Sequence, residues 1–141
     1  MEFKSNERKV SIEWGDCDPA GIVYYPRYFA IFDGSTTALF ENCLGMTKYQ
    51  FLKHYGFLGY PMLDTAARFI APTRFGDTVV VQTKLVAVGR SSFEVEHKLF
   101  KDGSIAVEAT EKRVWVVRDP ADVDRIKSQA IPEEVIRKLA R

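Results

Sequence analysis

Residues 15–28 read GDCDPAGIVYYPRY and separate two different hydrophobic periods. Before them, residues 8–14 alternate apolar and polar side chains, which is the period of a half-buried strand. After them, apolar residues recur at spacings of three and four from Pro26 until Gly45, which predicts a helix with a proline in its first turn and a glycine at its end. The Asp, Pro and Gly residues in between predict a turn that joins the strand to the helix.

The helix predicted after this turn is long and carries a wide apolar stripe. At 1.5 Å per residue, about 18 residues give a length of about 27 Å. The residues expected to face the core occupy two flanks, one with Phe29, Phe32, Thr36, Phe40 and Cys43 and the other with Tyr28, Ile31, Ala38 and Leu39. A stripe of this width favours a helix that the rest of the chain wraps around rather than covers on one side.

A short helix, four strands and a last helix are predicted in the second part of the chain. Thr47 and Gln50 have the capping-box spacing that begins a short helix. The four strands are expected at residues 62–71, 78–88, 92–101 and 104–118. Asp102-Gly103 is a strong hairpin signal between the last two, and residues 132–141 have the pattern of a short amphipathic helix.

Consecutive strands joined by short turns pair antiparallel, so these strands predict one antiparallel sheet. One long apolar helix with such a sheet gives an α+β domain, and no linker or repeat divides residues 1–141, which are expected to form a single domain. His97 lies on the apolar face of its strand, where a hydrogen-bonded core histidine is expected. Glu111 and Arg113 interrupt the apolar face of the last strand.

Composition argues against several classes of function. Hydrophobic residues at 46%, charged residues at 28% and a net charge of +1 are ordinary for a globular protein and do not suggest a nucleic-acid surface. No apolar run reaches the length of a membrane span and no secretory signal is visible, so a cytoplasmic protein is expected. Cys17, Cys43, His54 and His97 form neither a disulfide framework nor a metal-ligand set, so no metal site is expected.

The loop places carboxylates a few residues ahead of the predicted helix start. Asp18 beside the free N–H groups of a helix start supplies an attacking or proton-accepting group and a positive site for an oxyanion, which attack on a carbonyl requires. Asp16, two residues away, is the competing carboxylate, and Asp-Pro-Ala-Gly is also ordinary turn chemistry. Cys17 is not expected to be a nucleophile because no histidine lies nearby to activate it.

Residues 15–28 closely resemble the signature of the 4-hydroxybenzoyl-CoA thioesterase family, whose members have the hotdog fold. The positions that match are Asp16, Asp18, Pro19, Ala20, Gly21, Ile22, Val23, Tyr25, Pro26 and Tyr28. Beyond residue 45 the resemblance spans most of the chain as an order of elements rather than as identity. It implies an antiparallel sheet wrapped around a central helix and hydrolysis of an acyl-CoA thioester without a metal or redox cofactor. It also implies a homodimer or homotetramer with active sites at subunit interfaces.

The resemblance assigns roles to three residues of the loop and helix. Asp18 would be the catalytic carboxylate, either as a nucleophile that forms an anhydride or as a general base on water. The backbone N–H of Tyr25 would stabilise the oxyanion. Asp33 matches an acid that accepts a hydrogen bond from the phenolic hydroxyl of the substrate, although it could equally be a solvated helix residue. Asp18 and Asp33 could meet one ligand from different chains.

Three basic residues are candidates for binding the phosphates of coenzyme A. Arg90 lies in the turn GRSSF, where the family carries a basic cluster, but Gly89 and Ser91 flank it here and leave a single cation. Arg125 and Lys127 match a second basic pair of the family. Each could also be ordinary surface charge, so the nucleotide is expected to be held more weakly or differently than in the family.

The sequence therefore predicts an acyl-CoA thioesterase that hydrolyses an aromatic acyl-CoA, with 4-hydroxybenzoyl-CoA as the best single candidate. A thioesterase for short or medium aliphatic acyl-CoAs is the nearest alternative. A hydratase or dehydratase of the same fold typically pairs an acid with a histidine, which the loop lacks. A non-catalytic acyl-CoA-binding module is the alternative from a different class.

Overall fold

The computed structural model describes residues 1–141, with three α-helices, seven strands and one short 3₁₀ turn, η1. In chain order the elements are β1 (Ser5–Ser11), η1 (Trp14–Asp16), α1 (Pro26–Leu44), α2 (Lys48–Tyr55), β2 (Met62–Phe69), β3 (Thr78–Val88), β4 (Ser92–Lys101), β5 (Ser104–Val114), β6 (Val116–Asp119), β7 (Asp122–Ser128) and α3 (Glu133–Leu139). None of the helices combines the length and the apolar character that crossing a membrane requires.

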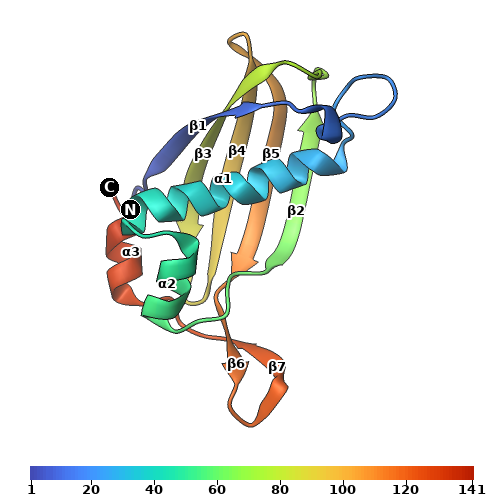
Figure 1. Ribbon diagram of the computed structural model, residues 1–141. Helices are drawn as coiled ribbons and strands as arrows, with labels where there is room; N and C mark the ends of the chain where they lie inside the picture. Colours follow the sequence, from blue (N-terminus) through green and yellow to red (C-terminus); the bar gives the residue numbers. More distant parts are fainter.

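Five strands form one antiparallel sheet in the order β1-β3-β4-β5-β2, and β6 pairs with β7 in a separate two-stranded hairpin. Figure 1 shows α1 lying across one face of the curved sheet, with α2 and α3 near the C-terminal end of α1. The β6–β7 hairpin projects from the bottom of the molecule. The predicted α+β class and the sheet wrapped around one long helix are therefore confirmed.

Local signals placed several elements correctly. The strands predicted at residues 78–88 and 92–101 coincide with β3 and β4, whereas β2 ends at Phe69 instead of residue 71. Asp102 and Gly103 form the loop between β4 and β5, with φ of 51° and 79°, which is the left-handed pair that a tight hairpin turn requires. Gly45 ends α1 at a φ of 68°, a conformation that costs glycine little.

The first strand was predicted too far along the chain, at residues 8–14 instead of Ser5–Ser11. Ile12 is buried, so the apolar alternation continues past the last residue that pairs with β3. Trp14 belongs to the 3₁₀ turn, is 64% exposed and contacts the edge of Phe75. Alternation therefore extended the predicted strand over residues whose backbone has already turned towards the loop.

Residues 104–118 are not one strand, because the backbone leaves β4 at Trp115. The Trp115 N–H donates to the carbonyl of Ser91, and the Trp115 carbonyl accepts from the N–H of Gln129. Its buried indole stacks on Phe57 with ring centroids 3.6 Å apart. The chain continues into β6, whose partner β7 was not predicted, because every residue of β7 is exposed and no alternation marks it.

Two hydrophobic clusters form the core, one with Phe40 and Trp115 and the other with Tyr28 and Phe32. Along α1, Thr36 lies between the two clusters and is itself buried. It contacts other buried polar residues, and the polar cluster so formed consists of Thr36, Thr83, His97, Glu111 and Arg113. The prediction of a hydrogen-bonded core histidine at His97 is confirmed.

Candidate active site

Asp18 lies in a tight loop between η1 and α1, and the loop is held by backbone hydrogen bonds. The Asp18 N–H donates to the carbonyl of Ile22, and the Asp18 carbonyl accepts from the N–H of Gly21. The side-chain Oδ1 accepts from the N–H of Ala20 at 2.8 Å, while Oδ2 has no hydrogen-bond partner. The half-buried carboxylate therefore supports the turn with one oxygen and leaves the other free.

Tyr25 supplies the free backbone donor at the start of α1. It precedes Pro26, which has no N–H, and it already has helical dihedral angles, with φ of −52° and ψ of −35°. The N–H groups of Arg27 and Tyr28 donate to the carbonyls of Tyr24 and Tyr25, but the N–H of Tyr25 has no acceptor. The positive end of the helix thus presents one unsatisfied donor, the N–H of Tyr25. Only Val23 and Tyr24 lie between this residue and the turn that contains Asp18.

Asp16 differs from Asp18 because its whole carboxylate is engaged. One oxygen accepts from the N–H of Glu13 at 2.9 Å, and the other accepts from the guanidinium of Arg27 at 3.0 and 3.2 Å. The Asp16 side chain is only 15% exposed. Asp16 ties η1 to the start of α1, which confirms the prediction that it is a hydrogen-bonding residue. The only hydrogen bond of the Cys17 thiol is to the carbonyl of Glu13, at 3.6 Å, so no base activates it.

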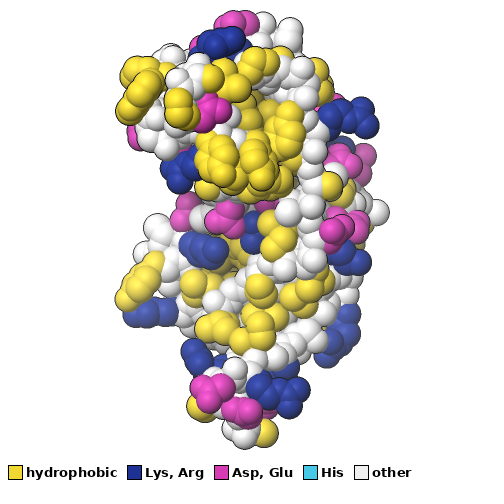
Figure 2. All heavy atoms as spheres, turned by 90° about the vertical axis from the view of Figure 1, so that its right-hand side faces the viewer, with side chains coloured by type: hydrophobic (Ala, Val, Ile, Leu, Met, Phe, Trp, Pro, Cys, Tyr) yellow, Lys and Arg dark blue, Asp and Glu magenta, His cyan; other side chains and the backbone are white.

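An apolar cavity of about 350 Å³ adjoins Tyr25, between the start of α1 and the end of β2. Val23, Tyr25, Tyr28, Phe69 and Ile70 contribute to its wall. Figure 2, which faces this side of the molecule, shows hydrophobic side chains gathered in the upper half of the surface. An acyl group of modest size could be accommodated beside the free N–H of Tyr25.

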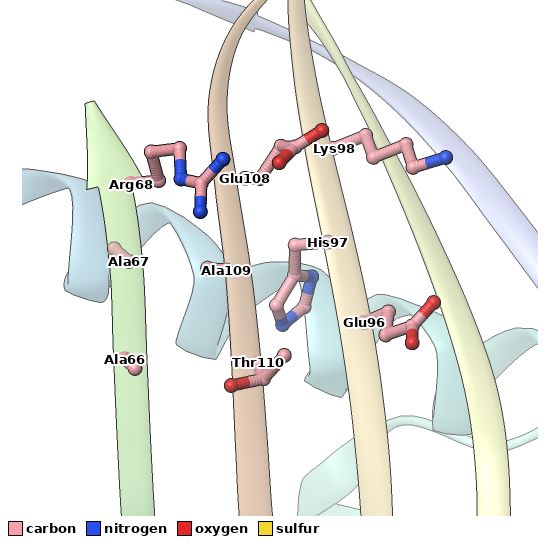
Figure 3. A pocket seen from close by; sticks show the side chains of 9 residues that line it. All are labelled: Ala66, Ala67, Arg68, Glu96, His97, Lys98, Glu108, Ala109 and Thr110. Atoms are coloured by element: carbon pink, nitrogen blue, oxygen red, sulfur yellow. The ribbon is translucent and has the colours of Figure 1, made fainter. Parts of the chain in front are cut away.

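Another hollow, of about 460 Å³, lies on the outer face of the sheet over β2, β4 and β5. Figure 3 shows Arg68, Glu96, Lys98 and Glu108 around it. His97 also borders this hollow, but its imidazole is buried and hydrogen-bonded to Thr36 and Thr83 of the polar cluster. This hollow contains neither the carboxylate nor the backbone donor described above, so its size does not make it the active site.

Asp33 lies on α1, about two turns beyond Tyr25, or roughly 12 Å along the helix axis. Its side chain is 56% exposed, yet it is not simply solvated, because Oδ1 accepts from Nη2 of Arg113 at 2.7 Å. The Arg113 side chain is only 5% exposed. In the sequence, Glu111 and Arg113 interrupt the apolar face of their strand, which is a signal of a buried ion pair. The pattern did not reveal the contact of Arg113 with Asp33.

The buried ion pair is fully charged near neutral pH. Burial by itself would raise the pKa of Glu111, but hydrogen bonds from His97, Arg113 and Thr36 outweigh it and lower this pKa to about 2. Burial likewise opposes the charge of Arg113, but Glu111 and Asp33 raise its pKa above the usual value. Asp33 therefore faces a permanent cation.

The three basic residues predicted to bind phosphates lie far from Asp18. Arg90 is exposed in the turn between β3 and β4, and its carbonyl accepts from the N–H that follows β7, that of Ile131. Arg125 and Lys127 are exposed on β7. The Asp18 loop pairs near the start of β3, and eleven residues of β3 span about 36 Å. One chain therefore brings Asp18 and Tyr25 together but separates them from the basic residues.

Comparison with known proteins covers nearly the whole chain. Residues 12–139 match the family described as the thioesterase-like superfamily. The chain is 29% identical over 131 residues to a 4-hydroxybenzoyl-CoA thioesterase of Pseudomonas sp. (strain CBS-3), covering 89% of this chain and 90% of the relative.

Solved structures agree with this match. A variant of a 4-hydroxybenzoyl-CoA thioesterase complexed with 4-hydroxybenzoyl-CoA has a TM-score of 0.86 at 27% identity, covering 96% of this chain and 99% of that one. A gentisyl-coenzyme A thioesterase has a TM-score of 0.82 at 27% identity, covering 96% and 100%. The similarity extends over the loop, α1 and the sheet alike.

Proposed function

The chain belongs to the thioesterase-like superfamily and has the hotdog fold, and we propose that this thioester hydrolase acts on an aromatic acyl-CoA, with 4-hydroxybenzoyl-CoA as the best candidate. The observation that carries the proposal is the pair of free groups in the loop, Oδ2 of Asp18 and the N–H of Tyr25. Two similar enzymes are named for hydroxylated aromatic acyl groups, 4-hydroxybenzoyl and gentisyl, which supports the choice of substrate.

The reaction needs an attacking group and a site for the negative charge that develops on the carbonyl oxygen. Asp18 either attacks the thioester carbon, releasing the thiolate and leaving an anhydride that water opens, or takes a proton from an attacking water. In both routes the Tyr25 N–H and the positive end of α1 stabilise the oxyanion. No metal or redox cofactor is required. A single turnover in ¹⁸O-labelled water can establish the anhydride route, because label enters the Asp18 side chain only when water opens an anhydride at the Asp18 carboxyl carbon, whereas general-base attack labels the released acid alone.

Asp33 supports the aromatic assignment. Its Oδ2 has no hydrogen-bond partner, so an ionised carboxylate can accept a hydrogen bond from a ring hydroxyl. A substrate without the hydroxyl would leave this acceptor desolvated and unpaired, which costs binding energy in the transition state.

The position of Arg90, Arg125 and Lys127 supports a homo-oligomeric enzyme, a dimer or tetramer. An acyl-CoA at Asp18 of one chain would meet these cations from a neighbouring chain, because about 36 Å of β3 separates them within one chain. The outer edge of β2 is unpaired, and Met62, Leu63 and Phe69 are exposed on this strand. An open apolar edge of this kind is suited to pairing with another copy.

One observation favours a second candidate, a thioesterase for short or medium aliphatic acyl-CoAs. The cavity beside Tyr25 is lined mainly by apolar side chains, which would accept an alkyl chain as well as a ring. In that case substitution of Asp33 would leave turnover unaffected.

Thiol release from 4-hydroxybenzoyl-, benzoyl-, phenylacetyl- and hexanoyl-CoA tests the proposal, with the wild type beside Asp18→Asn and Asp16→Asn. We expect the hydroxylated aromatic to be the fastest substrate and Asp18→Asn to abolish its turnover. Asp16→Asn should lower thermal stability more than turnover. Turnover of hexanoyl-CoA alone would contradict the aromatic assignment, and no release from any substrate would instead favour an acyl-CoA-binding module.

A further inference from the structure

Arg113 projects from β5 into the space beneath α1 and makes four hydrogen bonds with its guanidinium. Nε and Nη2 donate to the two carboxylate oxygens of Glu111, at 2.9 and 3.2 Å. Nη1 donates to the carbonyl of Tyr60 at 3.1 Å. Nη2 also donates to Oδ1 of Asp33 at 2.7 Å, the shortest of the four contacts. The planar fork thus joins the buried Glu111 to the half-exposed Asp33.

The inner end of this connection is fixed by the rest of the polar cluster. Oε1 of Glu111 accepts from the hydroxyl of Thr36 at 2.6 Å, and Oε2 lies 3.3 Å from Nε2 of His97. The other ring nitrogen of His97 lies 2.9 Å from the hydroxyl of Thr83. Glu111 is thus held by side chains from α1, β4 and β5, and it in turn holds the guanidinium of Arg113 that Asp33 meets.

We propose that Arg113 is a positioning residue for substrate selection, which holds the Asp33 carboxylate so that its free Oδ2 accepts a hydrogen bond from a hydroxyl group on the acyl ring. This inference rests on the proposed function. A surface ion pair usually contributes little because two mobile side chains must be ordered. Here the cation is already ordered by burial, so only Asp33 loses freedom, and Oδ1 is the oxygen that is occupied. Arg113 touches no substrate atom in this arrangement.

A double-mutant cycle on the ratio of kcat/KM for 4-hydroxybenzoyl-CoA to that for benzoyl-CoA tests the positioning role. Removing Arg113 alone would leave the buried carboxylate of Glu111 without its guanidinium partner, which can unfold the protein. Arg113 is therefore replaced together with Glu111, in the double variant Arg113→Gln/Glu111→Gln (the neutral pair). The neutral pair is made both in the wild-type protein and in the Asp33→Asn variant. Arg113→Lys is the conservative variant, since it retains a cation for Glu111 but has no fork to reach both carboxylates.

We expect the neutral pair and Arg113→Lys each to lower the ratio by about tenfold or more, as the loss of a charged hydrogen bond predicts. Neither should lower it further in the Asp33→Asn background. Circular dichroism spectra and melting curves establish that each variant is folded. An equal fall for both substrates in both backgrounds would show a structural role and overturn the inference.

The outcome also separates the inference from the proposed function. A wild type that prefers the hydroxylated substrate, with Arg113 variants that keep the full preference, overturns the inference alone. A wild type that hydrolyses neither aromatic thioester removes the proposed function, and the inference falls with it.

Discussion

The Asp18 loop and the Asp33–Arg113 pair are built in opposite ways. The turn around Asp18 is continuous in sequence and is closed by hydrogen bonds between residues two to four positions apart, and Gly21 and Val23 tie the loop to Phe75 and Thr73. The pair joins residues 80 positions apart, and its cation is held by a buried polar cluster drawn from α1, β3, β4 and β5. In the proposed function, the turn that presents the catalytic carboxylate of Asp18 is therefore formed locally, whereas the carboxylate that selects the acyl group is positioned by the assembled core.

The largest expected effect is on the local side of this comparison. Asp18→Asn should lower kcat by roughly 10²- to 10⁴-fold, because the variant has no carboxylate to act as base or nucleophile. Its side-chain oxygen can still accept from the N–H of Ala20, so the loop and the melting temperature should be retained. Thiol release and thermal melts measure the two quantities. Equal kcat in wild type and variant would place the chemistry elsewhere.

Substitutions in the buried polar cluster should change the stability of the protein. Arg113→Ala removes the guanidinium that pairs with the buried carboxylate of Glu111, which should lower the free energy of unfolding by about 3–5 kcal/mol. Urea denaturation measures this loss, with Arg90→Ala as the exposed control that should change stability by less than about 0.5 kcal/mol. A loss as small as that of the control would mean that the pair does not anchor the core.

Lowering the pH should reduce the stability that the same polar cluster contributes. The pKa of Glu111 falls from 4.5 to about 2 on folding, so its contribution is complete above pH 4.5 and is lost as the pH falls towards 2. The stability advantage of the wild type over Glu111→Gln should shrink across that window, by up to about 3 kcal/mol. Denaturation curves at a series of pH values measure it. A constant difference would contradict the paired, ionised state of Glu111.

The smallest effect concerns the predicted phosphate contacts. Arg90→Ala should raise KM by about two- to fivefold and leave kcat unchanged, since one exposed cation contributes little in water. The difference should diminish at high salt, where exposed charges are screened. Lys9→Ala, an exposed cation on β1, is the control. Identical KM values for the two variants would make Arg90 ordinary surface charge.

The same contrast explains how much the sequence could predict. The helix from Pro26, the hairpin at Asp102 and the strands β3 and β4 follow from local periodicity and turn chemistry, and Asp18 stands out in a contiguous motif. The β6–β7 hairpin carries no periodicity, because β7 is exposed throughout. The Asp33–Arg113 contact depends on how α1 lies on β5, which no local pattern specifies.

The most direct test of both halves of the site is the structure of the Asp18→Asn variant with 4-hydroxybenzoyl-CoA bound. We expect the thioester carbonyl oxygen to lie within hydrogen-bond distance of the Tyr25 N–H, and the ring hydroxyl to donate to Oδ2 of an Asp33 still paired with Arg113. A carbonyl oxygen away from Tyr25, or a ring hydroxyl without contact to any Asp33, would contradict this expectation.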